Sequence, residues 1–193
     1  QTKNTAEVLV LSAPTGAVLE SVTVERTAVH QSRCRSTDGS ATWRICTEPT
    51  LDKSNNGSTQ YVGFAKRPDM DLTAGFYDAP QVLTLTTDEP GGVICYTLDG
   101  TEPTRTSKVY TGPITLDSTK VVKARTFSAD RTLLPSFIRF NTYFIKENFS
   151  YPVLSISADS LQDLANGADS IRPIGSIEYF GLDKTRASAS CSR

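Results

Sequence analysis

At 193 residues, with 20 Lys and Arg against 21 Asp and Glu, the chain carries a net charge of -1. Nucleic acids and anionic lipids attract proteins that gather an excess of basic residues on one face, so this balance argues against both partners. No apolar run reaches the ~18 residues of a membrane-spanning helix, and we expect no membrane insertion. Abundant Ser and Thr, with 12 Gly and 10 Pro, favour strands and turns over helices.

The first 60 residues predict two β-hairpins followed by a loop. Val8–Leu11 is an apolar run and Val18–Val24 alternates, with a turn at Pro14–Gly16 between them. Asp38-Gly39, a strong hairpin signal, separates two further strands. Cys34 and Cys46 flank this second hairpin and could form a disulfide; two buried free thiols are the alternative. The polar residues 51–60 predict a loop or linker.

The middle of the chain, from Gly75 to about Lys146, alternates regularly between strand and turn signals. In the strand expected at residues 120–128, the smaller side chains of Val122, Ala124 and Thr126 should face inward, and Phe127 should cover an end of the core. Short strands broken by turn residues at intervals of about 8 to 12 residues are typical of an all-β sandwich or barrel. The expected strands are Gln81–Thr87, Val93–Leu98, Lys108–Leu116, Lys120–Ser128 and Ser136–Ile145.

The last 46 residues, 148–193, change character. A strand is predicted after Pro152, then a short helix capped by Asp159 or Ser160 and ended by Gly167, then a strand around residues 176–183. The final residues, 185–193, lack periodicity and are expected to be frayed.

The middle segment also carries a set of short motifs at regular spacing. They are Gly75-Phe76-Tyr77, Ile94–Gly100, Pro103-Thr104, Ser107–Ile114, Lys123-Ala124 and Thr142-Tyr143-Phe144. With this spacing, the segment resembles the chitobiase/β-hexosaminidase C-terminal-type domain. The resemblance implies a small immunoglobulin-like sandwich that accompanies a catalytic barrel and contributes no catalytic carboxylate.

The upstream hairpins resemble the second half of a bacterial lamin-tail domain. The matching residues are Ser32, Arg35, Asp38-Gly39-Ser40, Trp43, Pro49-Thr50 and Asn55 or Asn56. The chain departs from that pattern at Cys34, where the family has Gly, and at Leu51-Asp52, where it has Pro-Gly. Since the first strands of such a sandwich are missing, we expect the chain to begin inside a larger protein.

The downstream residues loosely resemble the opening of the spore-coat protein H (CotH) kinase-like family, at Tyr151–Ser157, Arg172-Pro173 and Ile177–Tyr179. The kinase-like body would have to follow Arg193, so phosphotransfer activity cannot be assigned to these residues.

Taken together, the patterns predict an all-β fold of immunoglobulin-like β-sandwiches with a short α/β C-terminal extension. The expected parts are a partial lamin-tail-like sandwich at 1–60, a linker at 61–74, a chitobiase-type sandwich at 75–147, and a CotH-like start with a partly disordered tail at 148–193.

The sequence predicts no catalytic, cofactor-binding or metal-ligating residue. Asp99 and Glu102 stand close together and could bind calcium, but a turn in which Asp99 bonds its own backbone explains them better. His30 has no recognisable nucleophile or partner acid, and no Gly-rich phosphate loop occurs.

Four aromatic residues are candidates for contact with a glycan: Trp43, Tyr77, Tyr96 and Tyr110. The alternative is that they pack in a core, with their polar atoms satisfied by hydrogen bonds. A carbohydrate-binding module should show at least two such rings exposed in a row on one sheet face, which separates the two readings.

These patterns favour a non-catalytic structural, spacer or assembly module of a secreted bacterial cell-surface protein. Its expected partners are neighbouring domains or copies of the same protein, joined by strand addition, and polysaccharide is a further candidate partner. A carbohydrate-binding accessory module is the first alternative. The second is an N-terminal fragment of a CotH-type kinase-like protein, which would bind nucleotide only with the downstream sequence restored.

Overall fold

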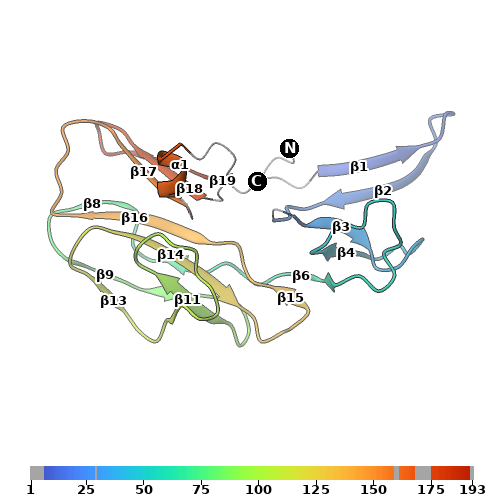
Figure 1. Cartoon of the computed structure of the whole chain (residues 1–193), viewed down its shortest axis with the longest axis horizontal. Coiled ribbons are helices and arrows are strands. Elements are labelled where there is room, and N and C mark those ends of the chain that lie inside the picture. The colour runs from blue at the N-terminus through green and yellow to red at the C-terminus, as the bar shows by residue number, and fades with distance from the viewer. Residues whose placement is uncertain (1–6, 29, 159–160, 168–174, 192–193) are drawn as a thin grey trace. The chain divides into compact units, whose positions relative to one another are not determined.

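The computed structural model describes residues 7–28, 30–158, 161–167 and 175–191, and nearly all of their regular structure is β-sheet (Figure 1). This confirms the predicted all-β class. The chain divides into two compact units, Gln1–Val62 and Gly63–Arg193. The boundary falls within residues 61–74, for which we predicted a linker; these residues also carry the short strands β6 (Gly63–Phe64) and β7 (Asp69–Met70).

The first unit consists of the two predicted hairpins and one further short strand. Strands β1 (Glu7–Ser12) and β2 (Val18–Val24) pair antiparallel, and Gly16 takes the positive φ of +84° that their turn requires. Strands β3 (Ser32–Arg35) and β4 (Trp43–Cys46) pair around the Asp38-Gly39 turn, and β5 (Gln60–Tyr61) adds to β4. Both hairpin predictions are confirmed.

The core of the first unit is small. Cys34 and Cys46 form a disulfide across β3 and β4, with Cα atoms 5.9 Å apart. Among the described residues of this unit, the buried hydrophobic side chains are these two and Ile45. The loop at residues 51–60 is fixed by Asp38, whose carboxylate accepts hydrogen bonds from the Ser54 hydroxyl and the Asn55 backbone N–H.

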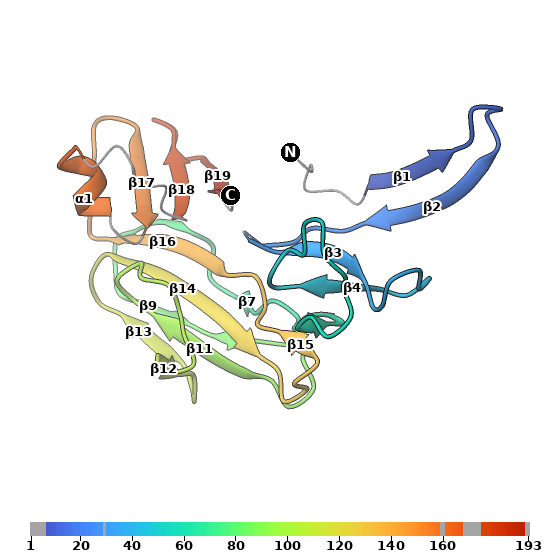
Figure 2. The same ribbon diagram turned by 45° about the vertical axis from the view of Figure 1, so that its right-hand side comes forward.

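The second unit contains a β-sandwich with a much larger core. One sheet has the order β12 (Lys108–Val109), β11 (Val93–Thr97), β14 (Lys120–Phe127), β16 (Arg139–Ile145), β8 (Gly75–Tyr77). The pairs β13 (Ile114–Leu116) with β9 (Gln81–Leu83), and β10 (Leu85–Thr86) with β7, supply the other side (Figure 2). Strand β8 runs parallel to β16, and β6 runs parallel to β15 (Leu133–Leu134).

The inward faces of the sandwich agree with the alternation of the sequence. In β14, Val122, Ala124 and Thr126 are fully buried, as predicted. Phe127 is also buried, but it lies outside the buried cluster of the sandwich and has the Arg105 guanidinium over its ring. Alternating residues of several strands fill the space between the sheets. The buried cluster consists of Met70, Leu83, Leu85, Ile94, Tyr96, Ile114, Leu116, Val122, Ala124, Tyr143 and Ile145.

A third sheet, β17 (Val153–Ala158), β18 (Gly175–Phe180) and β19 (Arg186–Cys191), completes the second unit. The predicted helix is present as α1 (Leu161–Ala165), and Gly167 follows it with a φ of +91°; the expected caps Asp159 and Ser160 lie outside the described residues. The expectation that residues 185–193 are frayed is wrong for 186–191. This segment lacks an apolar pattern of its own, but it pairs along the full length of β18.

No helix among the described residues is long and apolar enough to cross a membrane.

Candidate functional site

The four candidate glycan-contact aromatics do not form a row on one sheet face. Trp43 belongs to the first unit, whereas Tyr77, Tyr96 and Tyr110 belong to the second. Trp43 is half-buried, and the guanidinium carbon of Arg35 lies 4.9 Å from its ring centroid. This is the distance of a cation–π contact, so one face of the indole is already covered.

The three tyrosines are packed within the sandwich. Tyr96 is 4% exposed and meets the Tyr110 ring edge-on, with 6.4 Å between centroids. The Lys108 ammonium lies 5.6 Å from the Tyr96 centroid. Tyr77 donates its hydroxyl hydrogen to the Thr73 carbonyl, and its partial burial raises the pKa of the phenol.

A shallow hollow of about 360 Å³ opens beside Tyr96 and Lys108. The Thr111–Thr115 segment and Leu98 form the rest of its wall. Because Tyr96 is almost fully buried and the lysine ammonium lies over its ring, the hollow offers a cation and backbone groups rather than an open aromatic face. A sugar ring could not stack there unless Lys108 moved.

The acidic loop at Asp99 is a turn whose carboxylates are both engaged. Asp99 Oδ1 accepts hydrogen bonds from the Thr101 hydroxyl, at 2.6 Å, and from the Thr101 backbone N–H, at 3.1 Å. These bonds hold the pKa of Asp99 below its usual value. Glu102 forms an ion pair with Arg125 at 2.8 Å. Gly100 has a φ of +79°, and a Cβ there would lie 2.9 Å from Ser157 Cβ, so only glycine fits.

His30, which the sequence left without a nucleophile or a partner acid, is exposed. Within the described ranges, no three His, Cys, Asp or Glu side chains come together as a metal site would require.

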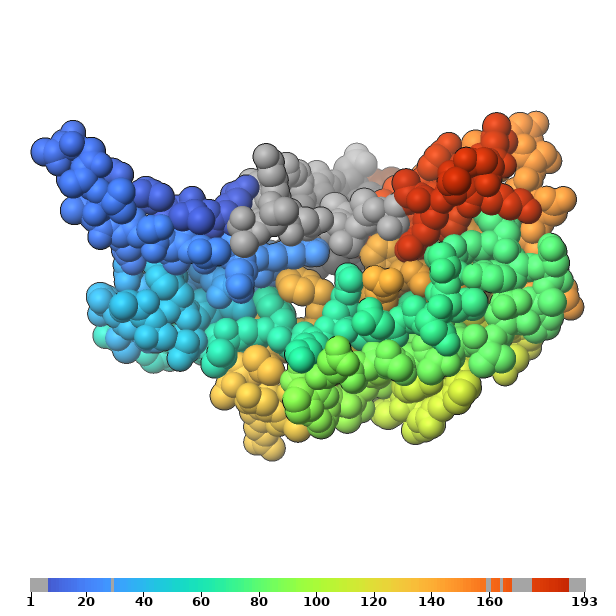
Figure 3. Space-filling model, turned by 180° about the vertical axis from the view of Figure 1, so that it is seen from behind, coloured from blue at the N-terminus to red at the C-terminus, as the bar shows by residue number. Residues whose placement is uncertain are grey.

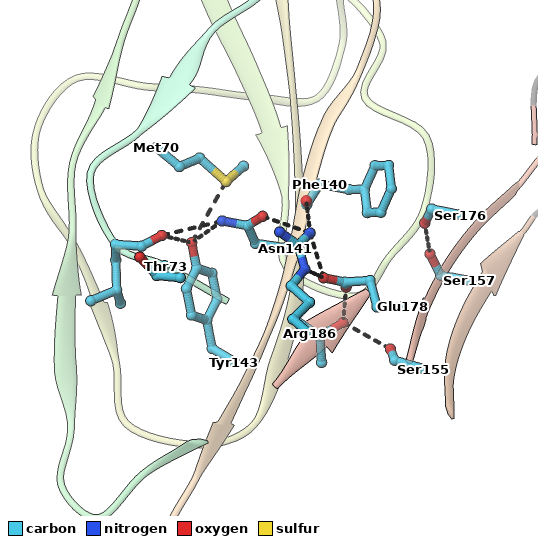
Figure 4. A network of polar contacts seen from close by, with 12 residues as sticks. Met70, Thr73, Phe140, Asn141, Tyr143, Ser155, Ser157, Ser176, Glu178 and Arg186 are labelled. Carbon is cyan, nitrogen blue, oxygen red and sulfur yellow. Dashed lines mark hydrogen bonds and ion pairs between the residues drawn. The ribbon is translucent and has the colours of Figure 1, made fainter. Parts of the chain in front are cut away.

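The most developed polar arrangement was not predicted from the sequence. Glu178 of β18 is 1% exposed, and its Oε1 accepts a hydrogen bond from Arg186 Nε at 2.7 Å. Its Oε2 accepts from the hydroxyl of Thr142 on β16, which is 2.8 Å from the Ser155 hydroxyl (Figure 4). A buried carboxylate is tolerated only when it is paired and hydrogen-bonded, and here both of its oxygens are satisfied.

The same network continues into the sandwich core. Arg186 Nη2 donates to Asn141 Oδ1 at 3.1 Å, and the Asn141 amide donates to the Tyr143 hydroxyl at 2.9 Å. Tyr143 in turn donates to the Leu72 carbonyl at 2.9 Å, and burial raises the pKa of its phenol to about 12. The third sheet is therefore joined to the sandwich by a chain of polar contacts from β19 to the loop after β7 (Figure 4).

The signal that could have revealed this network is the presence of Asn141-Thr142 and Glu178 within otherwise apolar strands. A polar residue on the inward side of such a strand needs a partner, although the sequence does not say which one. The chemistry of the network is that of a structural contact.

Comparison with known proteins supports the central resemblance. Residues 72–134 match the family model of the chitobiase/beta-hexosaminidase C-terminal domain. An endoglucanase of Clostridium saccharobutylicum is 34% identical over 83 residues, which are 43% of this chain and 18% of that enzyme. No solved structure matches the chain. The lamin-tail and CotH resemblances stay predictions, and the family match covers residues 72–134 alone.

Proposed function

We propose that the chain is a non-catalytic structural or spacer module of a secreted bacterial cell-surface protein. The match of residues 72–134 to a domain named for the C-termini of glycosidases supports an accessory position beside other domains. The Cys34–Cys46 disulfide supports an oxidising compartment outside the cytoplasm, because disulfides persist there.

The observation that carries the proposal is the packing of the candidate aromatics. Sugar-binding faces present exposed rings, whereas Tyr96 is 4% exposed and both Tyr96 and Trp43 have a cationic side chain over the ring. The buried network around Glu178 also suits a spacer, since it fixes the third sheet to the sandwich. A module so joined would hold its neighbours at a set separation.

A carbohydrate-binding accessory role is the second candidate. It is favoured by the likeness to part of an endoglucanase and by the hollow beside Tyr96 and Lys108. If this role were correct, removal of the lysine side chain would uncover the tyrosine ring and strengthen binding.

Retention of the purified chain on insoluble cellulose and chitin tests the two candidates. The spacer proposal predicts that the wild type and the Lys108→Ala variant stay in the supernatant, as does an exposed control variant, Lys53→Ala. Retention of the wild type, altered by Lys108→Ala and unaffected by Lys53→Ala, would reject the spacer in favour of the sugar-binding module.

A further inference from the structure

The hairpin β1–β2 exposes apolar side chains on both of its faces. On one face, Leu9 pairs with Val22, and together with Arg33 and Trp43 they line a hollow of about 250 Å³. The hairpin is the dark blue ribbon that extends past β3 and β4 of its own unit in Figure 1, and it forms the dark blue projection in Figure 3. Six large side chains are between 53% and 65% exposed: Val8, Leu9, Val10, Leu11, Val18 and Leu19.

This exposure is unusual for a unit with so small a core. The first unit buries three hydrophobic side chains among its described residues and leaves more than twice as many large ones exposed. A two-stranded ribbon is marginally stable in water by itself, and burial of apolar surface is the main force that would stabilise it. The hairpin therefore gains stability from any contact that covers it.

Strand β1 also has an open edge. It pairs with β2 on one side, and no other described strand pairs with it. Natural edge strands usually avoid pairing through lysine, proline, a bulge or short length. Between Glu7 and Ser12 the strand reads Val-Leu-Val-Leu, without charge or proline, and its register shift comes only at the Leu11/Ser12 end. Among the other edge strands, β12 has two residues and β19 begins with Arg186. Strand β17 is also an uncharged edge of six residues, but it has two large exposed side chains, Leu154 and Ile156, where β1 has four.

We propose that the open edge of β1 pairs antiparallel with β1 of a second copy of this chain. The product is a four-stranded sheet in the order β2–β1–β1–β2. Two-fold symmetry about an axis normal to the sheet places a residue opposite its own copy, at Leu9 or at Val10. Glu7 then faces Leu11 of the second copy or lies beyond the paired stretch, so the two Glu7 carboxylates do not oppose each other.

The same symmetry places equivalent apolar side chains next to each other across the new edge. Equivalent faces of the two hairpins lie on the same side of the joint sheet, so the exposed side chains of one β1 strand lie beside those of the other. Edge pairing leaves the outer faces of these side chains open to solvent. The area buried is therefore well below the about 800 Å² per partner of a standard interface, and the dimer belongs to the weak, concentration-dependent class.

The test is the molar mass of the full, disulfide-intact chain, measured by light scattering from micromolar to several hundred micromolar concentration. The molar mass of the wild type should rise from 21.0 kDa towards twice that value as the concentration increases. In the Val10→Lys variant, each lysine lies opposite the other lysine in the register centred on Val10, or opposite Val8 of the second copy in the register centred on Leu9, and the midpoint concentration should rise at least tenfold. The matched control, Val82→Lys, replaces a valine that is 57% exposed on the sandwich and should behave as the wild type.

A second measurement guards against misfolding of the lysine variant. One of the two variants Leu9→Cys and Val10→Cys, the one whose cysteine lies opposite its own copy, should give a cross-linked dimer under mild oxidation, whereas Val62→Cys, which is also exposed, should not. A wild type that stays at 21.0 kDa throughout the range would overturn the proposal. So would a dimer that Val10→Lys leaves intact, because association would then use another surface. Neither result bears on retention by polysaccharide, so the two proposals fail separately.

Discussion

The two units of the chain are both built from β-strands, yet they are stabilised in different ways. The sandwich buries a continuous cluster of apolar side chains, with Leu83, Leu116 and Val122 fully inaccessible to solvent. The first unit buries little besides a disulfide and Ile45. A unit of about 60 residues buries a smaller fraction of its surface than a larger one, so a covalent link has more to contribute there.

The largest expected effect is in the sandwich core. Leu116→Ala should lower the free energy of unfolding of the second unit by about 4 kcal/mol, because the site is fully buried and a cavity would remain. Urea unfolding followed by far-UV circular dichroism measures this loss. The single tryptophan, Trp43, lies in the first unit, so its fluorescence transition should not move. If both transitions shift together, the two units unfold as one and are not stabilised independently of each other.

Removal of the disulfide should produce the opposite pattern. Replacing both Cys34 and Cys46 by Ser should destabilise the first unit by about 3 kcal/mol, since the link closes a short loop in the unfolded chain. The Trp43 fluorescence transition should move to lower urea, or vanish, while that of the sandwich stays in place. Cys95→Ser, at a buried free cysteine of the second unit, is the control and should leave the Trp43 transition unchanged.

The buried ion pair should matter less than the apolar core. Arg186→Gln leaves the Glu178 carboxylate buried with Thr142 as its remaining donor, and we expect a loss of about 2 kcal/mol in the second unit. Arg186 is partly exposed, so water can replace part of the interaction. The control variant, Arg131→Gln, replaces an exposed arginine and should change the free energy of unfolding by less than about 0.5 kcal/mol. Equal effects at the two positions would show that the ion pair does not stabilise the fold.

The smallest effect should come from the Asp99 turn. Asp99→Asn weakens the bonds from Thr101 and should reduce the free energy of unfolding by about 1 kcal/mol at neutral pH. The folded-state pKa of Asp99 is lowered, first by the Thr101 hydroxyl. Its stabilisation is therefore present above the unfolded pKa of about 3.9 and is lost as pH falls through the lower folded value. Urea midpoints between pH 6 and pH 2 should converge for the wild type and the variant; a constant difference would contradict this assignment.

The strands and turns could be predicted because their signals are local. Alternation identified the inward face of β14, and Asp-Gly pairs located two turns, at Gly39 and Gly100. The network around Glu178 could not be predicted, since Thr142 and Glu178 are 36 residues apart and Asn141 and Leu72 are 69 apart. Strand β19 was missed for a related reason: its conformation comes from backbone pairing with β18 rather than from its own side chains.

The parallel pairing of β8 with β16 bears on how the sandwich would carry tension. The chain enters this five-stranded sheet through β8 and leaves it at the C-terminal end of β16, where Gly75 lies opposite Tyr143 and Tyr77 opposite Ile145. A pull on these two ends acts along the strands in opposite directions. The bonds between them are then loaded together in shear, whereas a hairpin pulled at its open end loses its bonds one at a time. The hydrogen bonds between β8 and β16 are thus the part of the sandwich that would resist extension.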